Sequence, residues 1–249
     1  NYTPDSIQKV HQAYGRAYQL PNSTAHNETC ASIGNLLFNW RMFEITGDAK
    51  YTDVVETELY NGILSGISLD GEKYFYTNPL RISKKFPYTL RWSKTREKYI
   101  SCFCCPPNTL RTLCEAQDYA YTTSKGTLWC NIYGSSVLKT KIGNGELKVT
   151  QTTEYPYNGK IVIVLDKVPS YRDFSTIRLR IPEWCDSATV SVNGLRQNVK
   201  IYTGKYLSIS RKWNNRDKIQ LVLEMRPQLI EANPLVEEDK NQVAVKRGP

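Results

Sequence analysis

The sequence predicts an α+β fold in which a helical N-terminal part precedes a series of antiparallel β-strands. In residues 1 to about 122, apolar residues recur at three- and four-residue steps, the period of a helix buried on one face. From about residue 126 the period becomes two, and Gly, Asn, Asp and Pro separate the short runs, as is typical of strands. We therefore expect two domains, residues 1–124 and residues 125–249, the second of them incomplete.

Two consecutive helices are expected near the N-terminus. The first covers residues 25–46, because these apolar residues share one of its faces: Ile33, Leu36, Leu37, Trp40 and Phe43. Gly47 is suited to end this helix, and Asp48 is placed to cap the next one at its N-terminus. The second helix is expected to stop near Gly66, and the short turn between the two helices predicts that they run antiparallel.

A less regular stretch follows. The Asp70-Gly71 pair signals a turn, and residues 74–76 are expected to form a short strand after it. Residues 81–100 form a polar, basic loop with no clear period. Pro106 is suited to the first turn of a third helix, which we expect to run to about residue 121.

The second half is expected to be an antiparallel β-sandwich, because short strands at regular spacing are typical of that architecture. The predicted strands are residues 128–134, 145–155, 159–166, 175–182, 188–194, 205–213 and 217–225. Residues 242–249 have the pattern of the beginning of a further strand.

The composition indicates which partners to expect. The net charge of +9 comes from basic residues that are scattered along the chain, so we expect a solvated basic surface and no nucleic-acid partner. No run of 18 apolar residues is present, so no membrane span is expected, and no targeting segment is visible. The 17 tyrosines and 5 tryptophans suit sugar faces as well as protein cores.

The cysteines form an unusual cluster. There are seven, an odd number, and Cys102, Cys104 and Cys105 fall within four positions. A second motif places Cys30 two residues after Glu28. Thiolates with one carboxylate suit Zn²⁺, which favours four tetrahedral ligands. Two alternatives remain open: a disulfide between Cys30 and one of the three clustered cysteines, or inert buried thiols.

These motifs carry a family resemblance. The runs HNETCASIGNLLFNW, YNGILSGISLDGEKYFYTNPL and CFCCPPNTLRTL resemble the bacterial β-L-arabinofuranosidases of glycoside hydrolase family 127 and the related family 146. The later run RIPEWCDSATVSVNG resembles the β-sandwich of the same proteins. The resemblance implies an (α/α)6 barrel that carries the active site. Residues 1–124 would be the C-terminal part of that barrel, and a missing segment or another chain would supply the rest.

The resemblance also implies roles for individual residues. It implies that Zn²⁺ is bound by Glu28, Cys30, Cys104 and Cys105, and that Cys104 is also the nucleophile of a retaining glycosidase. The substrate would be a plant cell-wall oligosaccharide that releases β-L-arabinofuranose or a related sugar. Cys102 matches a family cysteine that is not a ligand. The implied source is a bacterium, with the protein in the periplasm or the cytoplasm.

One position departs from the family pattern. The family has its acid/base glutamate sixteen residues before the zinc glutamate, where this chain has Gln12. Glutamine has no carboxyl proton to donate. The open explanations are an introduced Glu→Gln change, a natural variant that recruits another acid, or a zinc-stabilised carbohydrate-binding protein with impaired catalysis.

Four further residues are candidates for contact with the sugar. Tyr76 and Asn78 match a family segment that reaches the sugar, although a core position for Tyr76 is the plain alternative. His26 lies two residues before Glu28 and is placed to line the pocket, with a surface position at the helix start as the alternative. Tyr14 flanks Gln12 and is placed to form a wall of the site.

Overall fold

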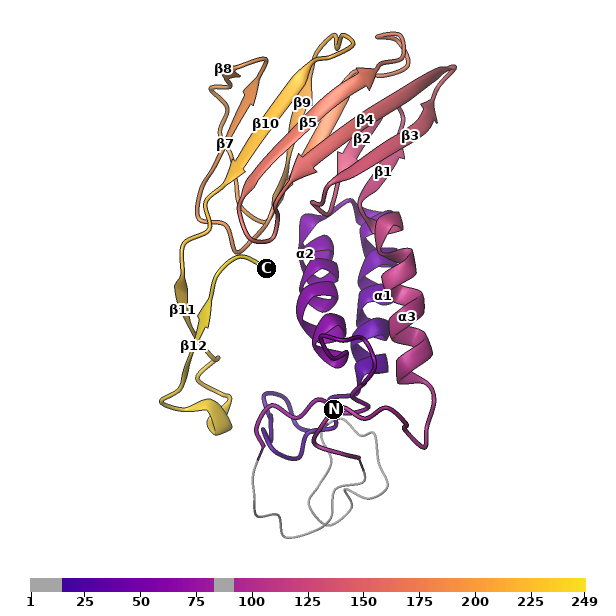
Figure 1. The fold of residues 1–249 in the computed structure, drawn as a ribbon. Helices are drawn as coiled ribbons and strands as arrows, with labels where there is room; N and C mark the ends of the chain where they lie inside the picture. The colour runs from indigo at the N-terminus through magenta and orange to yellow at the C-terminus, as the bar shows by residue number, and fades with distance from the viewer. Residues whose placement is uncertain (1–14, 83–91) are drawn as a thin grey trace. The chain divides into compact units, whose positions relative to one another are not determined.

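The structure is a computed structural model that describes residues 15–82 and 92–249. Contacts within the chain divide it into two compact units. Unit 1 comprises Asn1–Phe38, Thr57–Glu115 and Gln228–Lys246, and unit 2 comprises Asn39–Glu56, Ala116–Pro227 and Arg247–Pro249. Helices, two main sheets and a separate hairpin make the chain a mixed α and β protein with mostly β-structure (Figure 1).

The first two helices largely agree with the sequence prediction. Helix α1 covers Thr29–Thr46, and Gly47, at a φ of 65°, follows its end. Asp48 caps helix α2, Ala49–Thr57, because its carboxylate accepts a hydrogen bond from the backbone N–H of Lys50 at 3.3 Å. The predicted second helix does not continue as one regular helix, since a π-helical turn over Glu58–Ile63 and a 3-10 turn over Leu64–Gly66 follow α2.

The less regular stretch differs from the prediction in two places. The strand expected at residues 74–76 is absent from the described residues, where Tyr74 forms only isolated bridges to Ile67 and Glu97. A strand did not form because each of these neighbouring segments meets Tyr74 at a single position. Helix α3 covers Cys105–Glu115 and then tightens into a 3-10 turn, so it ends before the predicted residue 121.

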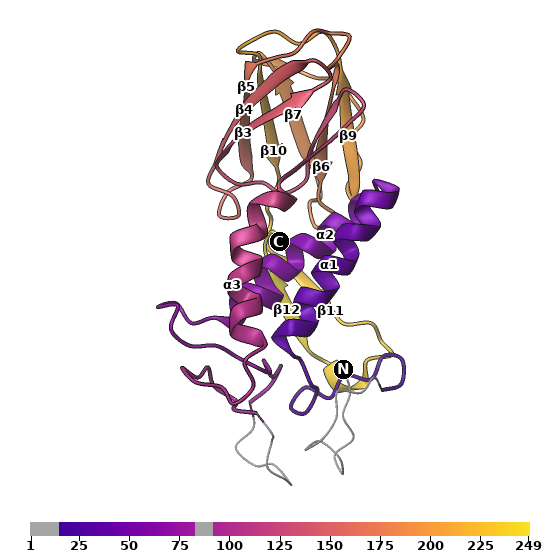
Figure 2. The ribbon, with the colours of Figure 1, turned by 90° about the vertical axis from the view of Figure 1, so that its right-hand side faces the viewer.

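Unit 2 contains two sheets that form two layers (Figure 2). One has the order β1-β2-β6-β9, with bounds Tyr121–Ser124, Thr127–Cys130, Thr176–Ile181 and Lys205–Ser210. The other has the order β3-β4-β5-β10-β7-β8, with bounds Ser136–Ile142, Gly145–Thr153, Lys160–Lys167, Lys218–Leu223, Ala188–Val192 and Leu195–Arg196. Alternate side chains of the central strands are fully buried and form the core: Leu147, Val149, Ile161, Ile163, Leu165, Ile177, Leu179, Ile219 and Leu221.

Each predicted strand of the second half has a counterpart, but the pairing is not wholly antiparallel. Strands β2 and β6 pair in parallel, with Leu128 opposite Ile177. Strands β1, β3 and the two-residue β8 were not predicted from the sequence. Strand β3 lies at a sheet edge and carries two lysines among its apolar residues, so its apolar positions are partly exposed and its pattern is weak.

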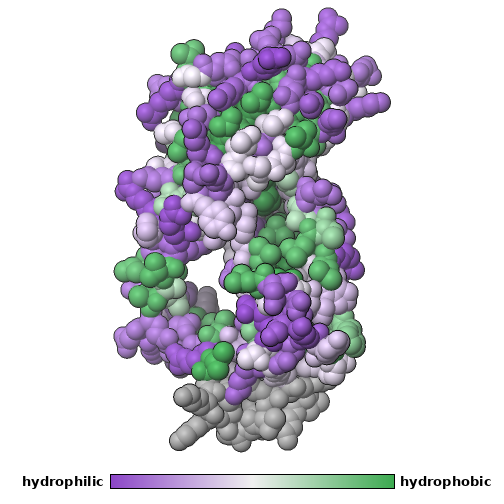
Figure 3. Space-filling view, in the orientation of Figure 1, coloured by the Kyte–Doolittle hydropathy of each residue, from purple (hydrophilic) through white to green (hydrophobic). Residues whose placement is uncertain are grey.

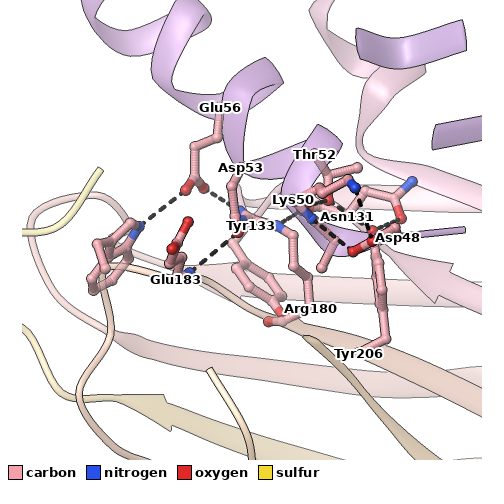
Figure 4. A network of polar contacts seen from close by, with 12 residues as sticks. Asp48, Lys50, Thr52, Asp53, Glu56, Asn131, Tyr133, Arg180, Glu183 and Tyr206 are labelled. Atoms are coloured by element: carbon pink, nitrogen blue, oxygen red, sulfur yellow. Dashed lines mark hydrogen bonds and ion pairs between the residues drawn. The ribbon is translucent and has the colours of Figure 1, made fainter. Parts of the chain in front are cut away.

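A buried polar network joins helix α2 to strand β6 within unit 2 (Figure 4). Arg180 is fully buried and donates to Asp53 at 2.5 Å, to Glu56 and to the backbone oxygen of Asn131. Glu56 also accepts hydrogen bonds from other side chains, among them the indole of Trp184 at 3.1 Å. Burial alone would lower the pKa of Arg180, but the charges of Glu56 and Asp53 outweigh it and hold the pKa above its usual value.

The last strands form a separate hairpin in unit 1. Strand β11, Gln228–Glu231, pairs antiparallel with β12, Val243–Lys246, which begins one residue after the start of the strand predicted there. Apolar side chains are exposed on this hairpin (Figure 3), namely Leu229, Ile230, Val243 and Val245. Among the described residues, no helix is both long and apolar enough to cross a membrane.

Candidate metal centre and adjoining cleft

Two chain segments of unit 1 bring the clustered residues together. Glu28 and Cys30 lie at the start of helix α1, and Cys104 and Cys105 lie at the start of helix α3. The segment around Tyr76 runs between them, because Glu28 forms a β-bridge with Thr77 and the backbone N–H of Thr29 donates to the Tyr76 oxygen at 3.0 Å. The backbone of this segment therefore holds the start of helix α1, and the Cys105 thiol at the start of helix α3 contacts the same Tyr76 oxygen at 3.8 Å.

The four side chains of the predicted ligand set converge. The Cys104 sulfur lies 3.7 Å from that of Cys105 and 3.6 Å from Oε1 of Glu28, and the Cys30 and Cys105 sulfurs are 3.4 Å apart. All four ligand atoms lie within 4.8 Å of one another. Cys102 stands beside this set, with its sulfur 3.9 Å from that of Cys104. None of the seven cysteines, all of which are in the described residues, forms a disulfide.

The electrostatics of the cluster differ between the carboxylate and the thiols. A hydrogen bond with His26, at 3.2 Å, is the main reason that the pKa of Glu28 lies below its usual value. Burial raises the pKa of Cys104 to about 12, and it raises the pKa of Cys105 further. Without a cation, the protein alone therefore favours the Glu28 carboxylate next to neutral thiols at Cys104 and Cys105.

This donor set fits Zn²⁺. Two sulfurs on a tetrahedral zinc with bonds of about 2.3 Å lie roughly 3.8 Å apart, close to the separations observed here. Three cysteines packed around one partly buried carboxylate also match the preference of zinc for sulfur, nitrogen and oxygen ligands. A bound dication would favour the thiolates that burial disfavours.

His26 and Tyr76 lie beside the cluster and orient Glu28. Both are buried, and the edge of one ring faces the other at 5.8 Å between centroids. The Tyr76 hydroxyl is hydrogen-bonded to Glu28, and its ring stacks on Trp92 with 3.8 Å between ring centroids. Tyr76 thus occupies the small core cluster that also contains Ile100 and Cys105, and His26 is not at the surface.

A cleft of about 950 Å³ opens next to Glu28 within unit 1. His26 and Asn78 line it, and the Asn78 amide donates to the Ser65 hydroxyl at 3.0 Å. Its other wall consists of helix α1 and the π-helical turn, where the Asn35 amide donates to Glu58 at 2.7 Å. Glu28 therefore faces both the cleft and the cysteine cluster.

Two of the predicted site residues, Gln12 and Tyr14, lie outside the described residues. The sequence did not predict the cleft wall formed by Asn35 and Glu58, because Glu58 begins the π-helical turn, which local sequence does not reveal. Nor did it predict Asn108, whose amide donates to the Cys30 sulfur at 3.1 Å. Asn108 could have been found from its spacing, because it follows Cys105 by three residues in a helix and residues so spaced lie on the same helix face.

The fold places three cysteines and a glutamate that could hold a metal ion beside a polar cleft, and comparison with known families gives the family. The model of the β-L-arabinofuranosidase GH127 catalytic domain matches residues 2–118, and that of the GH127 middle domain matches residues 127–225. The chain belongs to glycoside hydrolase family 127.

Individual relatives agree with this assignment. The non-reducing end β-L-arabinofuranosidase of Bifidobacterium longum subsp. longum is 32% identical over 257 residues, which cover 100% of this chain and 38% of that protein. A solved glycoside hydrolase is 59% identical with a TM-score of 0.91, and the match covers 100% of this chain and 41% of that one. The crystal structure of Ara127N-Se, a GH127 β-L-arabinofuranosidase from Geobacillus stearothermophilus T6, is 36% identical with a TM-score of 0.86. That match covers 93% of this chain and 37% of the other, so the chain spans about two fifths of the length of these relatives.

Proposed function

We propose that this chain forms part of a retaining glycosidase that releases β-L-arabinofuranose, or a related sugar, from plant cell-wall glycans. The observation that carries the proposal is the position of the Cys104 sulfur beside Glu28, Cys30 and Cys105, next to a polar cleft, in a chain of family 127. The names of the relatives support the substrate class, since two of them are β-L-arabinofuranosidases.

Cys104 is the nucleophile in this proposal. Glu28, Cys30, Cys104 and Cys105 would hold a Zn²⁺ ion, which when bound keeps the thiols ionised and fixed in place. The Cys104 sulfur attacks the anomeric carbon, so that a C–S bond forms as the glycosidic C–O bond breaks. Water then displaces the sulfur, the C–S bond breaks, and the free sugar leaves with the thiolate restored. Two displacements retain the configuration at the anomeric carbon.

The leaving oxygen needs a proton during the first displacement. The family pattern assigns this step to position 12, where a carboxylic acid would donate the proton and afterwards accept one from the attacking water. Gln12 keeps the size and hydrogen-bonding capacity of glutamate but has no such proton. The chain as it stands is therefore proposed to hydrolyse slowly unless another acid substitutes.

Gln12 also supports a second candidate function. A zinc-stabilised carbohydrate-binding protein would keep the cleft, His26 and Asn78 while lacking turnover. The sugar would be held by the polar groups of the cleft and the metal would serve only to fix the starts of helices α1 and α3.

The architecture we propose follows the same family. Residues 1–124 are the C-terminal part of an (α/α)6 barrel, and residues 125–249 belong to a β-sandwich. Because the chain spans about two fifths of its relatives, the rest of the barrel would come from a further segment or another chain. The exposed apolar side chains of the β11–β12 hairpin fit burial against such a segment. We also propose that the protein is bacterial and is located in the periplasm or the cytoplasm.

Substitution of one sulfur separates the two functions. In the enzyme, Cys104→Ser abolishes release of an aryl β-L-arabinofuranoside while most sugar affinity remains, as measured by calorimetry. Cys102→Ser is the matched control, since that sulfur lies 3.9 Å from Cys104 and outside the ligand set. If the Cys104→Ser protein turned over substrate at the unchanged rate, the nucleophile role would be refuted. No turnover by any form, together with sugar binding, would favour the binding protein.

A further inference from the structure

The sulfurs of the cluster make different hydrogen bonds. The side-chain amide of Asn108 donates to the Cys30 sulfur at 3.1 Å. The Cys105 sulfur donates to the backbone oxygen of Tyr76 at 3.8 Å, and Cys105 is fully buried. In the part of the chain that the structure describes, the contacts of the Cys104 sulfur are a carboxylate and other thiols, with no N–H donor.

The orientation of the Asn108 amide is fixed by a second contact. The guanidinium of Arg111, one turn further along helix α3, donates to Oδ1 of Asn108 at 2.8 Å. A guanidinium has only donors, so the atom that it contacts must be the amide oxygen. The nitrogen of Asn108 is then the atom that faces Cys30. Arg111 therefore donates to the oxygen of the Asn108 amide, and the nitrogen of the same amide donates to the Cys30 sulfur.

An N–H donor changes what a thiolate can do. A hydrogen bond to a charged sulfur spreads part of its negative charge onto the donor and is stronger than a bond between neutral groups. A sulfur with such a donor is a weaker nucleophile and a more firmly oriented ligand, because the donor restricts rotation of the side chain. A sulfur without one keeps its electron density.

We propose that Asn108, held by Arg111, is a positioning residue that assigns the Cys30 sulfur to metal binding and leaves the Cys104 sulfur as the reactive one. This inference rests on the proposed function, because it explains how two cysteines that bind the same metal come to have different roles. Asn108 touches neither the Cys104 sulfur nor the carboxylate in the described contacts, so its effect on the reaction passes through Cys30.

The test uses Co²⁺ in place of zinc in the purified protein, because thiolate-to-cobalt charge transfer gives an absorption band that reports electron density on sulfur. Asn108→Ala and the nearly isosteric Asn108→Asp both remove the donor. We expect each to shift this band to lower energy and to weaken Zn²⁺ binding by about 10- to 100-fold in competition with a chelator. Arg111→Ala, which frees the amide to turn, should give a smaller shift in the same direction.

Two further variants make the result specific. Leu110→Ala alters an exposed side chain of the same helix and should leave band and affinity unchanged. In a Cys104→Ser background, the shift caused by Asn108→Ala should persist, since the donor acts on Cys30. A wild-type band in both Asn108 variants, with circular dichroism showing folded protein, would overturn the inference alone. Failure of the unaltered protein to take up Co²⁺ or Zn²⁺ would contradict both the inference and the proposed function.

Discussion

The Cys104 sulfur lies 3.6 Å from Oε1 of Glu28, although 76 positions separate the two residues in the sequence. Each sits at the start of a helix, and the backbone oxygen of Tyr76 accepts from the N–H of Thr29 at one helix start and contacts the Cys105 thiol at the other. The carboxylate is also held by His26 and Tyr76, so it keeps its position before any metal binds. The centre is therefore a tertiary arrangement of unit 1 and is expected to be lost when that unit unfolds.

Restoring a carboxylic acid at position 12 should increase turnover. We expect Gln12→Glu to raise kcat by about 10²- to 10⁴-fold, the usual contribution of general acid catalysis, while the affinity for sugar changes little. The measurement is the release of the aryl group from an aryl β-L-arabinofuranoside. Gln12→Asn serves as the control, because it changes size without adding an acid. An unchanged rate in Gln12→Glu would show that position 12 is not the acid position.

Adding a methyl group at Gly62 should narrow the cleft. A Cβ there would lie 2.2 Å from Oε2 of Glu58 and 2.8 Å from the hydroxyl of Ser32, so the Glu58 carboxylate would have to leave Asn35. We expect Gly62→Ala to lower the free energy of unfolding by about 1–3 kcal/mol and to weaken sugar binding. Gly34→Ala is the matched control for stability on helix α1, since nothing lies within 4 Å of its added Cβ, and it lines the same cleft. Equal effects of the two substitutions on the free energy of unfolding would contradict the close packing at Gly62.

Breaking the buried network of unit 2 should lower the free energy of unfolding far more than replacing another arginine of the same strand. Arg180→Met leaves Asp53 and Glu56 without their cation, and the loss of one partner of a buried pair costs about 3–5 kcal/mol. Urea unfolding measures the difference. Arg178→Met, on the same strand but only half-buried over the Trp129 ring, should cost less than half as much. Equal stability of the two variants would contradict the role of Arg180 in holding the buried carboxylates.

High pH should destabilise unit 2. Burial raises the pKa of Cys130 to about 12, against a reference value of 9.0 for an exposed thiol. Because the folded pKa is the higher one, its contribution to stability is present below pH 9 and is lost as the pH rises toward 12. The free energy of unfolding should fall by up to about 1.4 kcal/mol per pH unit for this one group. Tyr121 and Tyr206, whose pKa values burial also raises, add to the fall.

A substitution isolates the thiol. In Cys130→Ala the slope of stability against pH between about 9 and 11 should be shallower than in the unaltered protein, although the variant is less stable at pH 7 because of the cavity it creates. Equal slopes in the two proteins would show that Cys130 does not titrate on unfolding.

The parts of the fold that the sequence predicted were those with a strong period. Helix α1 and the central strands β5, β6 and β10 bury alternate or one-sided apolar residues, and that pattern depends on local sequence alone. The π-helical turn after α2 was not predictable in this way, because an apolar period does not distinguish such a turn from a continuing α-helix. The parallel pairing of β2 with β6 likewise depends on topology, since a strand's alternation does not reveal the direction of its neighbour.

The candidate site was predictable to a different extent. The spacing of Glu28, Cys30, Cys104 and Cys105 indicated a zinc set, and the family resemblance selected it over a disulfide or inert thiols. The sequence at the start of helix α3 could not show that the Asn108 amide would face Cys30 or that Arg111 would hold that amide. Side-chain orientation there depends on how α3 lies against the start of α1.

The central claim is that Glu28, Cys30, Cys104 and Cys105 bind one zinc ion. Crystals of the purified protein, measured on both sides of the zinc absorption edge, give an anomalous difference map that locates zinc directly. The account predicts a single zinc peak within bonding distance of all four side chains, with the Cys102 sulfur outside the coordination sphere. A map with no zinc peak beside Cys104, from protein purified without chelator, would contradict it.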